Sequence, residues 1–288
     1  MSPEARLILH EWSSPIFLDL AIAATCFFYV RGWLALRRSS PSLLSIGKPA
    51  AFLSGMLCLW VAIGSPLAAF DEASLTVHMI QHILLMLVVP PLVLLGAPAM
   101  PLLHGLPQWF VRTPVGPFLR WSPIQSLGHF LTNPIVSWIL AALALFLWHA
   151  PASFELALRS DAWHEFEHGC FLFTSILFWW PVIQPFPTEP RWPAWSAPLY
   201  LFLGMIPGSV LGAFLVFCDR VVYPSYAEAP KIFAMTPLED QVLAGLLMWV
   251  LGFFVCVVPA VYLTIRLLSP QNLQSADAVH APQQVFHS

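Results

Sequence analysis

The sequence His78-Met79-Ile80-Gln81-His82 stands at the head of an apolar run that continues from Leu84 to Pro90. A second stretch, His164-Glu165-Phe166-Glu167-His168, precedes the apolar run from Phe171 to Pro181 in the same way. Residues four positions apart share one face of an α-helix, and the rise of about 1.5 Å per residue places the two imidazoles of each stretch roughly 6 Å apart along the axis. Each pair therefore has a spacing that can bind one metal ion.

The composition is that of a polytopic membrane protein. Of the 288 residues, 58% are hydrophobic and 9% are charged, and the mean hydropathy is +0.75, whereas roughly 25% of the residues of a soluble domain are charged. The 28 prolines lie mainly at the ends of apolar runs, where they stop helices, and aromatic residues flank these runs as they do at membrane interfaces. We expect the chain to be surrounded by membrane lipids and to bind no nucleic acid.

Seven apolar runs approach the length of about 20 residues that a membrane-spanning helix needs. We expect an all-α bundle of seven transmembrane helices over residues 15–35, 49–65, 75–95, 134–149, 165–184, 196–217 and 239–264. The second and fourth runs are short, so they would extend into flanking polar residues or stand nearly upright in a thinner bilayer. Residues 1–268 would form a single transmembrane domain, and the polar, glutamine-rich residues 269–288 would form a disordered cytoplasmic tail.

The distribution of charge predicts the orientation of this bundle, because basic residues are enriched in cytoplasmic connections. One set of connections carries eight of the twelve Lys and Arg residues, and the other set, together with the N-terminus, carries four. Thirteen of the fifteen acidic residues fall on the side with fewer basic residues. We therefore expect the N-terminus outside and the C-terminus in the cytoplasm. The proline-broken connection over about residues 97–132 would then form short interfacial helices on the inner leaflet.

This topology brings three polar clusters to the same outer depth. Both histidine stretches and Glu239-Asp240-Gln241 open helices that return into the membrane, and His149 ends the fourth helix. Imidazole is a ligand for copper, zinc and iron, and ionisable groups at this depth are costly unless they are paired or functional. The predicted metal ligands are His78, His82, His149, His164, His168 and Asp240. Asp240 could equally cap the seventh helix.

Neighbouring residues are candidates for supporting roles at this site. Gln81 and Glu167 each precede the second histidine of a pair and could hold an imidazole ring by a hydrogen bond. Met79 and Met248 could add soft thioether ligands, although most methionines in such a chain pack in the core. A single HxxxH pair at a membrane interface is often only an amphipathic anchor. Two pairs at matching depth favour metal binding.

Several motifs in order resemble one family. They are His78 to His82 through Pro90-Pro91 to Gly96-Ala97-Pro98, Trp148-His149-Ala150-Pro151, His164 to His168 through Trp179-Trp180-Pro181, Pro207-Gly208-Ser209-Val210-Leu211-Gly212-Ala213, Tyr223-Pro224-Ser225-Tyr226, and Leu238-Glu239-Asp240-Gln241 through Ala244-Gly245 to Met248-Trp249. From about residue 50 to 262 the chain is similar to the multi-span CtaG-type cytochrome c oxidase assembly factors. This resemblance implies a protein of the bacterial plasma (inner) membrane that helps to mature a haem–copper oxidase, with oxidase subunits as partners and copper as its metal.

The preferred hypothesis is therefore an assembly factor, not an enzyme, that holds copper at the outer face and passes it to an oxidase subunit. A membrane di-iron enzyme also uses HxxxH clusters, but those clusters usually face the cytoplasm. A b-type cytochrome with one axial histidine from each pair, and a copper importer or tolerance protein, are further alternatives. Against a transporter, no charged residue lies deep in the predicted spans, where an ion path often requires one.

Overall fold

The computed structural model describes residues 6, 9–10, 12, 15–39, 45–185, 192–230 and 233–269. Within these ranges every regular element is a helix, as the apolar runs predict. The longer elements are α2 (Ile16–Ser39), α3 (Gly47–Ile63), α10 (Pro134–His149), α12 (Asp161–Ile183), α13 (Ser196–Phe217) and α15 (Pro237–Leu267). The run from residue 75 to 95 is built from α4 (Leu75–Ile83), the π-helical turn η3 (Leu84–Val88) and α5 (Val89–Leu95). The predicted disordered tail lies, from residue 270 onward, outside the described residues.

Six of the predicted spans are long and apolar enough to cross a membrane. They are Ile16–Arg38, Gly47–Phe70, Leu75–Leu95, Asp161–Ile183, Ser196–Phe217 and Pro237–Leu267. The remaining one, α10, meets the same test only together with α9 (Ser122–Leu131), and the two helices are bent by 71° at the break between them. Asn133, whose side chain accepts hydrogen bonds from the first turn of α10, and Pro134 after it start a new helix there. The described part of the chain therefore has six helices that could cross a membrane, or seven candidate spans if the bent pair counts as one.

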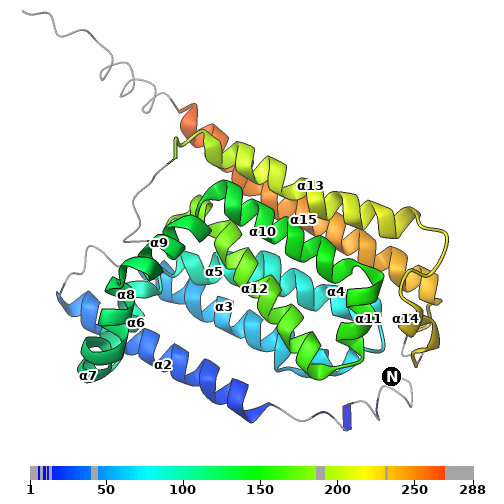
Figure 1. Ribbon diagram of the computed structural model, residues 1–288, viewed down its shortest axis with the longest axis horizontal. Coiled ribbons are helices and arrows are strands. Elements are labelled where there is room, and N and C mark those ends of the chain that lie inside the picture. The colour runs from blue at the N-terminus through cyan, green and yellow to red at the C-terminus, as the bar shows by residue number, and fades with distance from the viewer. Residues whose placement is uncertain are drawn as a thin grey trace, which may run out of the picture.

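The helices lie side by side, with α2 along one edge and α13 with α15 along the opposite edge (Figure 1). The short helices α11 (Pro151–Leu158) and α14 (Pro224–Glu228) lie at one end of the bundle. We call this the histidine end, because α4 and α12 both begin there and α10 ends there. The short elements of the long connection lie at the other end: α6 (Ala99–Gly105), α7 (Gln108–Phe110), η4 (Val111–Val115), α8 (Gly116–Arg120) and α9.

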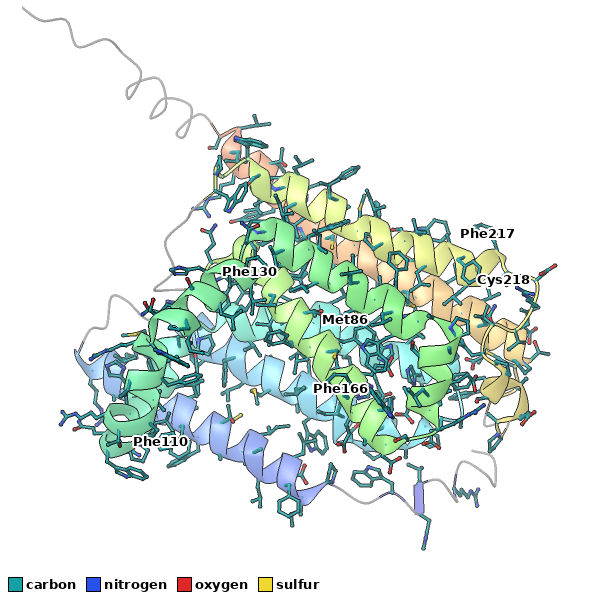
Figure 2. All side chains as sticks on the ribbon, viewed as in Figure 1. Met86, Phe110, Phe130, Phe166, Phe217 and Cys218 are labelled. Carbon is teal, nitrogen blue, oxygen red and sulfur yellow. The ribbon has the colours of Figure 1, made fainter. Side chains whose placement is uncertain are left out.

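The outer surface of the bundle is apolar, and this is the reverse of a soluble protein. Phe202, Ile206, Val210 and Phe214 form an exposed stripe along α13 at helical spacing. Figure 2 shows Phe110, Phe130 and Phe217 projecting from the periphery, whereas Met86 lies among the helices. Exposed apolar area on this scale is stable only against lipid or another apolar partner. The surface therefore agrees with several membrane-spanning helices.

Two helix crossings depend on glycine because backbones meet directly. A Cβ atom added to Gly212 of α13 would lie 2.8 Å from the carbonyl oxygen of Gly245, and one added to Gly245 of α15 would lie 2.9 Å from that of Gly212. A Cβ atom on Gly32 of α2 would overlap the carbonyl oxygen of Pro101 in α6. Small residues of this kind allow close helix packing in membranes, where lipid gives helices little hydrophobic reason to associate.

The π-helical turn after the first histidine pair follows from the prolines that end it. Pro90 has no backbone N–H, so the carbonyl of Met86 lacks its α-helical donor. The indole N–H of Trp179 in α12 donates to that carbonyl at 3.2 Å. The N–H of Val89 instead closes the wider turn by bonding to Leu84. One bond thus fixes α12 against the segment that carries His78 and His82.

The start of α4 is capped by a side chain from α15. The carboxylate of Asp240 accepts hydrogen bonds from the backbone N–H groups of Leu75 and Thr76, at 2.7 and 3.1 Å, and from the Ser74 hydroxyl at 3.0 Å. Capping of the seventh long helix was one of two alternatives for Asp240, but that helix is capped by Thr236, whose side chain forms a capping box with Glu239. Asp240 is therefore a cap, but of a helix far from it in the sequence.

We predict that Asp240→Ala destabilises the protein. The substitution leaves two buried N–H donors of α4 without partners, and each such donor costs about 1–3 kcal/mol. The measurement is unfolding of the purified protein in detergent, with the exposed Glu228→Ala in α14 as the control. If Asp240→Ala leaves stability unchanged but lowers metal binding, then Asp240 acts as a ligand and not as a cap.

We predict that Trp179→Phe also lowers stability, by about 1–3 kcal/mol, because phenylalanine retains most of the ring volume and leaves the Met86 carbonyl without a donor. Trp163→Phe is the matched control, because Trp163 lies in the same helix with its side chain exposed. Equal unfolding midpoints for the two variants would show that the indole bond does not hold α12 in place.

Candidate metal centre

Five imidazoles from three helices meet at the histidine end. His78 and His82 come from α4, His164 and His168 from the first turns of α12, and His149 from the last turn of α10. Both members of the first pair and His149 are buried, and the α12 pair is partly buried. In each pair the spacing of four residues brings the rings together, with centroids 4.3 Å apart in α4 and 4.2 Å apart in α12.

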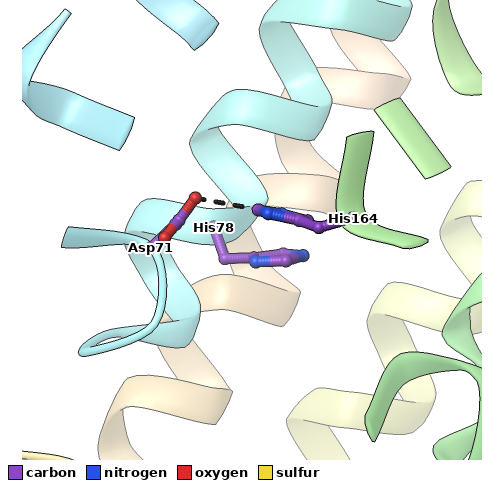
Figure 3. A group of neighbouring side chains, drawn as sticks. All are labelled: Asp71, His78 and His164. Atoms are coloured by element: carbon purple, nitrogen blue, oxygen red, sulfur yellow. Dashed lines mark ion pairs between the residues drawn. The ribbon is translucent and has the colours of Figure 1, made fainter. Parts of the chain in front are cut away.

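The two histidine pairs face each other across the gap between α4 and α12. The rings of His78 and His164 are nearly parallel, with centroids 5.2 Å apart (Figure 3). One turn further along, His82 lies 5.5 Å from His168 and 5.7 Å from His149, again between ring centroids. The five histidines predicted from the sequence therefore lie together, and their role as metal ligands stays a prediction.

Two carboxylates from different segments join this cluster. An oxygen of Asp71, in the loop between η2 (Pro66–Phe70) and α4, lies 3.8 Å from Nε2 of His164 (Figure 3). An oxygen of Glu167 in α12 lies 3.6 Å from Nε2 of His82. Two groups of three residues result, Asp71 with His78 and His164, and Glu167 with His78 and His82. Within each group, one possible ligand atom from each residue lies within 4.8 Å of those from the other two.

The polar atoms of the cluster are buried without hydrogen-bond partners. Among the residues that the structure describes, these unpartnered atoms include both ring nitrogens of His78 and of His82, Nε2 of His149, His164 and His168, and both carboxylate oxygens of Glu167. A buried polar group without a partner costs about 1–3 kcal/mol, and native proteins contain few of them. Their concentration at one place makes this cluster the candidate site for a bound ion or ordered water.

The orientation of His149 shows how one ring is prepared for a ligand. Its Nδ1 lies 2.8 Å from the carbonyl oxygen of Leu145, one turn earlier in α10. Because a carbonyl can only accept, Nδ1 carries the proton of the neutral ring, which leaves the lone pair of Nε2 free. The Tyr223 hydroxyl donates to the carbonyl oxygen of His149 at 3.0 Å and holds the end of α10 in place.

Asp71 is a member of the site that the sequence interpretation missed. Its side chain is 8% exposed, and burial raises the pKa of its carboxyl group to about 7. The Tyr226 hydroxyl donates to the Asp71 carbonyl oxygen at 2.8 Å and fixes the loop. The available signal was an acidic residue in the short polar segment immediately before the first histidine pair, but no regular spacing connects it to that pair.

The structure separates the other predicted residues from the cluster. Asp240 belongs to neither candidate ligand group, and its carboxylate instead accepts hydrogen bonds at the start of α4. Gln81 donates to the carbonyl oxygen of Ala62 at 2.9 Å and not to an imidazole. Glu167, the other candidate for holding an imidazole ring, faces His82 of the other helix at 3.6 Å. Met79 and Met248 belong to a hydrophobic core cluster.

A cavity of about 800 Å³ opens onto one side of the cluster. Its polar lining includes Asp71, Glu72, Asp161, His164, Glu165 and His168. Asp71 and His164 therefore border this cavity, whereas His82 and Glu167 do not. His82 and His149 instead border a smaller apolar cavity of about 100 Å³, lined further by Met86, Met248 and Cys256. The cluster thus has a polar, acidic side and an apolar side.

Comparison with known proteins finds relatives of this chain in mycobacteria. Uncharacterized proteins of Mycobacterium bovis and Mycobacterium tuberculosis are each 27% identical over 250 residues, which is 86% of this chain and 38% of theirs. One from Mycobacterium leprae is 25% identical over 238 residues, 80% of this chain and 36% of its own length. The chain thus spans less than half the length of these relatives. No solved structure matches it.

The family comparison covers most of the chain. The sequence profile described as cytochrome c oxidase caa3 assembly factor (Caa3_CtaG) matches residues 27–269. This range contains every helix from α3 to α15 and the second half of α2, together with all five clustered histidines and Asp71. The chain is therefore a member of the cytochrome c oxidase caa3 assembly factor family.

Proposed function

We propose that this protein is an assembly factor that holds a copper ion at the outer face of the bacterial plasma membrane and passes it to a subunit of a haem–copper oxidase. Family membership supports the role in oxidase assembly. Support for copper comes from the donor set, because imidazole suits copper and must be neutral to bind it. In this proposal copper is a cargo, and the protein carries out no reaction of its own.

The observation that carries the proposal is the set of unpartnered ring nitrogens around His78 and His82. A bound ion would give several of these buried atoms a partner at once. The two carboxylates of Asp71 and Glu167 supply two negative charges when ionised, which balance one divalent ion. Burial makes that balance important, because an uncompensated charge inside a helix bundle is expensive.

The orientation in the membrane supports delivery on the outer side. Arg112 and Arg120 lie in the connection at the end opposite the histidine end. Asp71, Glu72, Asp161 and Glu165 line the cavity beside the histidines. Because basic residues favour the cytoplasmic side, this arrangement supports a topology with the histidine end outside and the C-terminus in the cytoplasm. A partner subunit could then receive copper through the acidic cavity.

We predict that replacing His78, His82, His164 and His168 together by alanine abolishes copper binding by the purified protein, because both imidazole pairs are removed. Copper is measured by elemental analysis after loading and desalting, and oxidase activity is measured in cells that carry the variant as their only copy. The double variant His104→Ala and His129→Ala is the control, since both of these histidines are exposed and lie in the connection between α5 and α10.

The copper prediction fails if the fourfold variant is folded and retains the copper content of the unsubstituted protein. Iron in place of copper in the unsubstituted protein, combined with oxygen-dependent turnover, would instead support a di-iron enzyme. Both results come from the same purified samples. The exposed-histidine control shows whether copper merely adheres to surface imidazoles.

We predict that a phosphatase reporter fused after Leu158 is active and that one fused after Leu268 is inactive. The reason is that the phosphatase folds only outside the cytoplasm. Leu158 ends α11 at the histidine end, and Leu268 follows α15 at the opposite end. The measurement is phosphatase activity per amount of fusion protein in intact cells. The reverse pattern would place the histidines in the cytoplasm and would exclude delivery at the outer face.

A further inference from the structure

The two ligand groups of the cluster share one residue. His78 belongs both to the group with Asp71 and His164 and to the group with His82 and Glu167. We call the first group the outer position and the second the inner position. Each position offers two imidazoles and one carboxylate, so each could coordinate a copper ion. The shared residue raises the question of how an ion occupies two neighbouring positions.

The two positions differ in their access to water. Asp71 and His164 line the 800 Å³ cavity, and the His164 side chain is 17% exposed. In the inner position His78 and Glu167 are fully buried and His82 is 2% exposed. None of these three residues lines the large cavity. An ion arriving from that cavity therefore meets the outer position first.

The ring of His78 is free to serve either position. Neither of its nitrogens has a hydrogen-bond partner, although the ring is fully buried. Metal-binding histidines are usually oriented by a hydrogen bond from the second nitrogen, as His149 is by the Leu145 carbonyl. A neutral imidazole carries one lone pair for a metal, so His78 can bind one ion at a time in this form. A shared ligand with no anchoring bond is suited to follow an ion between two positions.

We propose that the cluster binds a single copper ion in two alternative positions, an outer exchange position at Asp71, His78 and His164 and an inner storage position at His78, His82 and Glu167. This inference rests on the proposed copper function and adds a route to it. The ion enters and leaves by the outer position and is retained at the inner one, with His78 as the ligand common to both. The charge is the same in each position, because each contributes one carboxylate.

The test uses the full chain in detergent, loaded with one equivalent of Cu(II), with release into excess EDTA followed by stopped-flow absorbance. Asp71→Asn weakens only the exchange position, through which the ion both enters and leaves. We therefore expect loading and release both to slow by about tenfold, while the final copper content stays near one ion per chain. Glu167→Gln weakens the storage position, so we expect faster release and a changed electron paramagnetic resonance spectrum. Wild type and Asp71→Asn should share one spectrum, since the ion rests at the inner position in both.

Matched variants separate these effects from general charge and folding. Glu72→Gln removes a carboxylate that lines the same cavity but belongs to neither position, and we expect its release rate to match that of the wild type. His164→Gln tests the exchange position from α12 if Asp71→Asn does not fold. It should give the same slow loading and slow release.

Two results would overturn the inference. Two Cu(II) ions bound per chain at once would show that the positions are separate sites, and equal acceleration of release by Asp71→Asn, His164→Gln and Glu167→Gln would show one undivided site. Either result leaves the copper function intact, because copper is still bound. A wild-type protein that binds no copper would instead refute the proposed function itself.

Discussion

The structure depends on the burial of imidazole nitrogens that have no partner within the protein. Both nitrogens of His78 and of His82 are enclosed between α4 and α12, and Glu167 faces them without a hydrogen bond. Each unpartnered atom costs about 1–3 kcal/mol, so the cluster works against folding unless something binds there. Contacts elsewhere in the bundle must therefore stabilise the fold enough to offset this cost, as the surroundings of functional sites generally do.

Several long-range contacts supply this support around the histidine end. Asp240 of α15 caps the helix that carries the first histidine pair, and Trp179 of α12 bonds to the carbonyl that Pro90 leaves free. Tyr223 and Tyr226 bond to the backbone of His149 and Asp71. These contacts, made by four side chains, join the segments that carry the candidate ligands, and none of them uses a side chain of the clustered histidines, Asp71 or Glu167. The scaffold can therefore remain fixed independently of what the candidate ligands bind.

Much of this arrangement follows from local sequence rules. The apolar runs and their prolines gave helix ranges close to those observed, and the spacing of four residues placed each histidine pair on one face. Other features could not be predicted because they join distant residues. Asp240 meets α4 across more than 160 residues, and Asp71 has no spacing relation to the histidines. Local sequence patterns predict helices and the residues that share a helix face, whereas tertiary packing determines which distant residues come into contact.

X-ray absorption spectroscopy of the copper-loaded protein tests the central claim most directly, because it reports the atoms bound to the metal. Convergence of the two histidine pairs predicts a shell of nitrogen and oxygen ligands that includes at least two imidazoles from the cluster, with no sulfur. A shell dominated by sulfur from Met86, Met248 or Cys256 of the apolar cavity, or a shell without imidazole scattering, would contradict it.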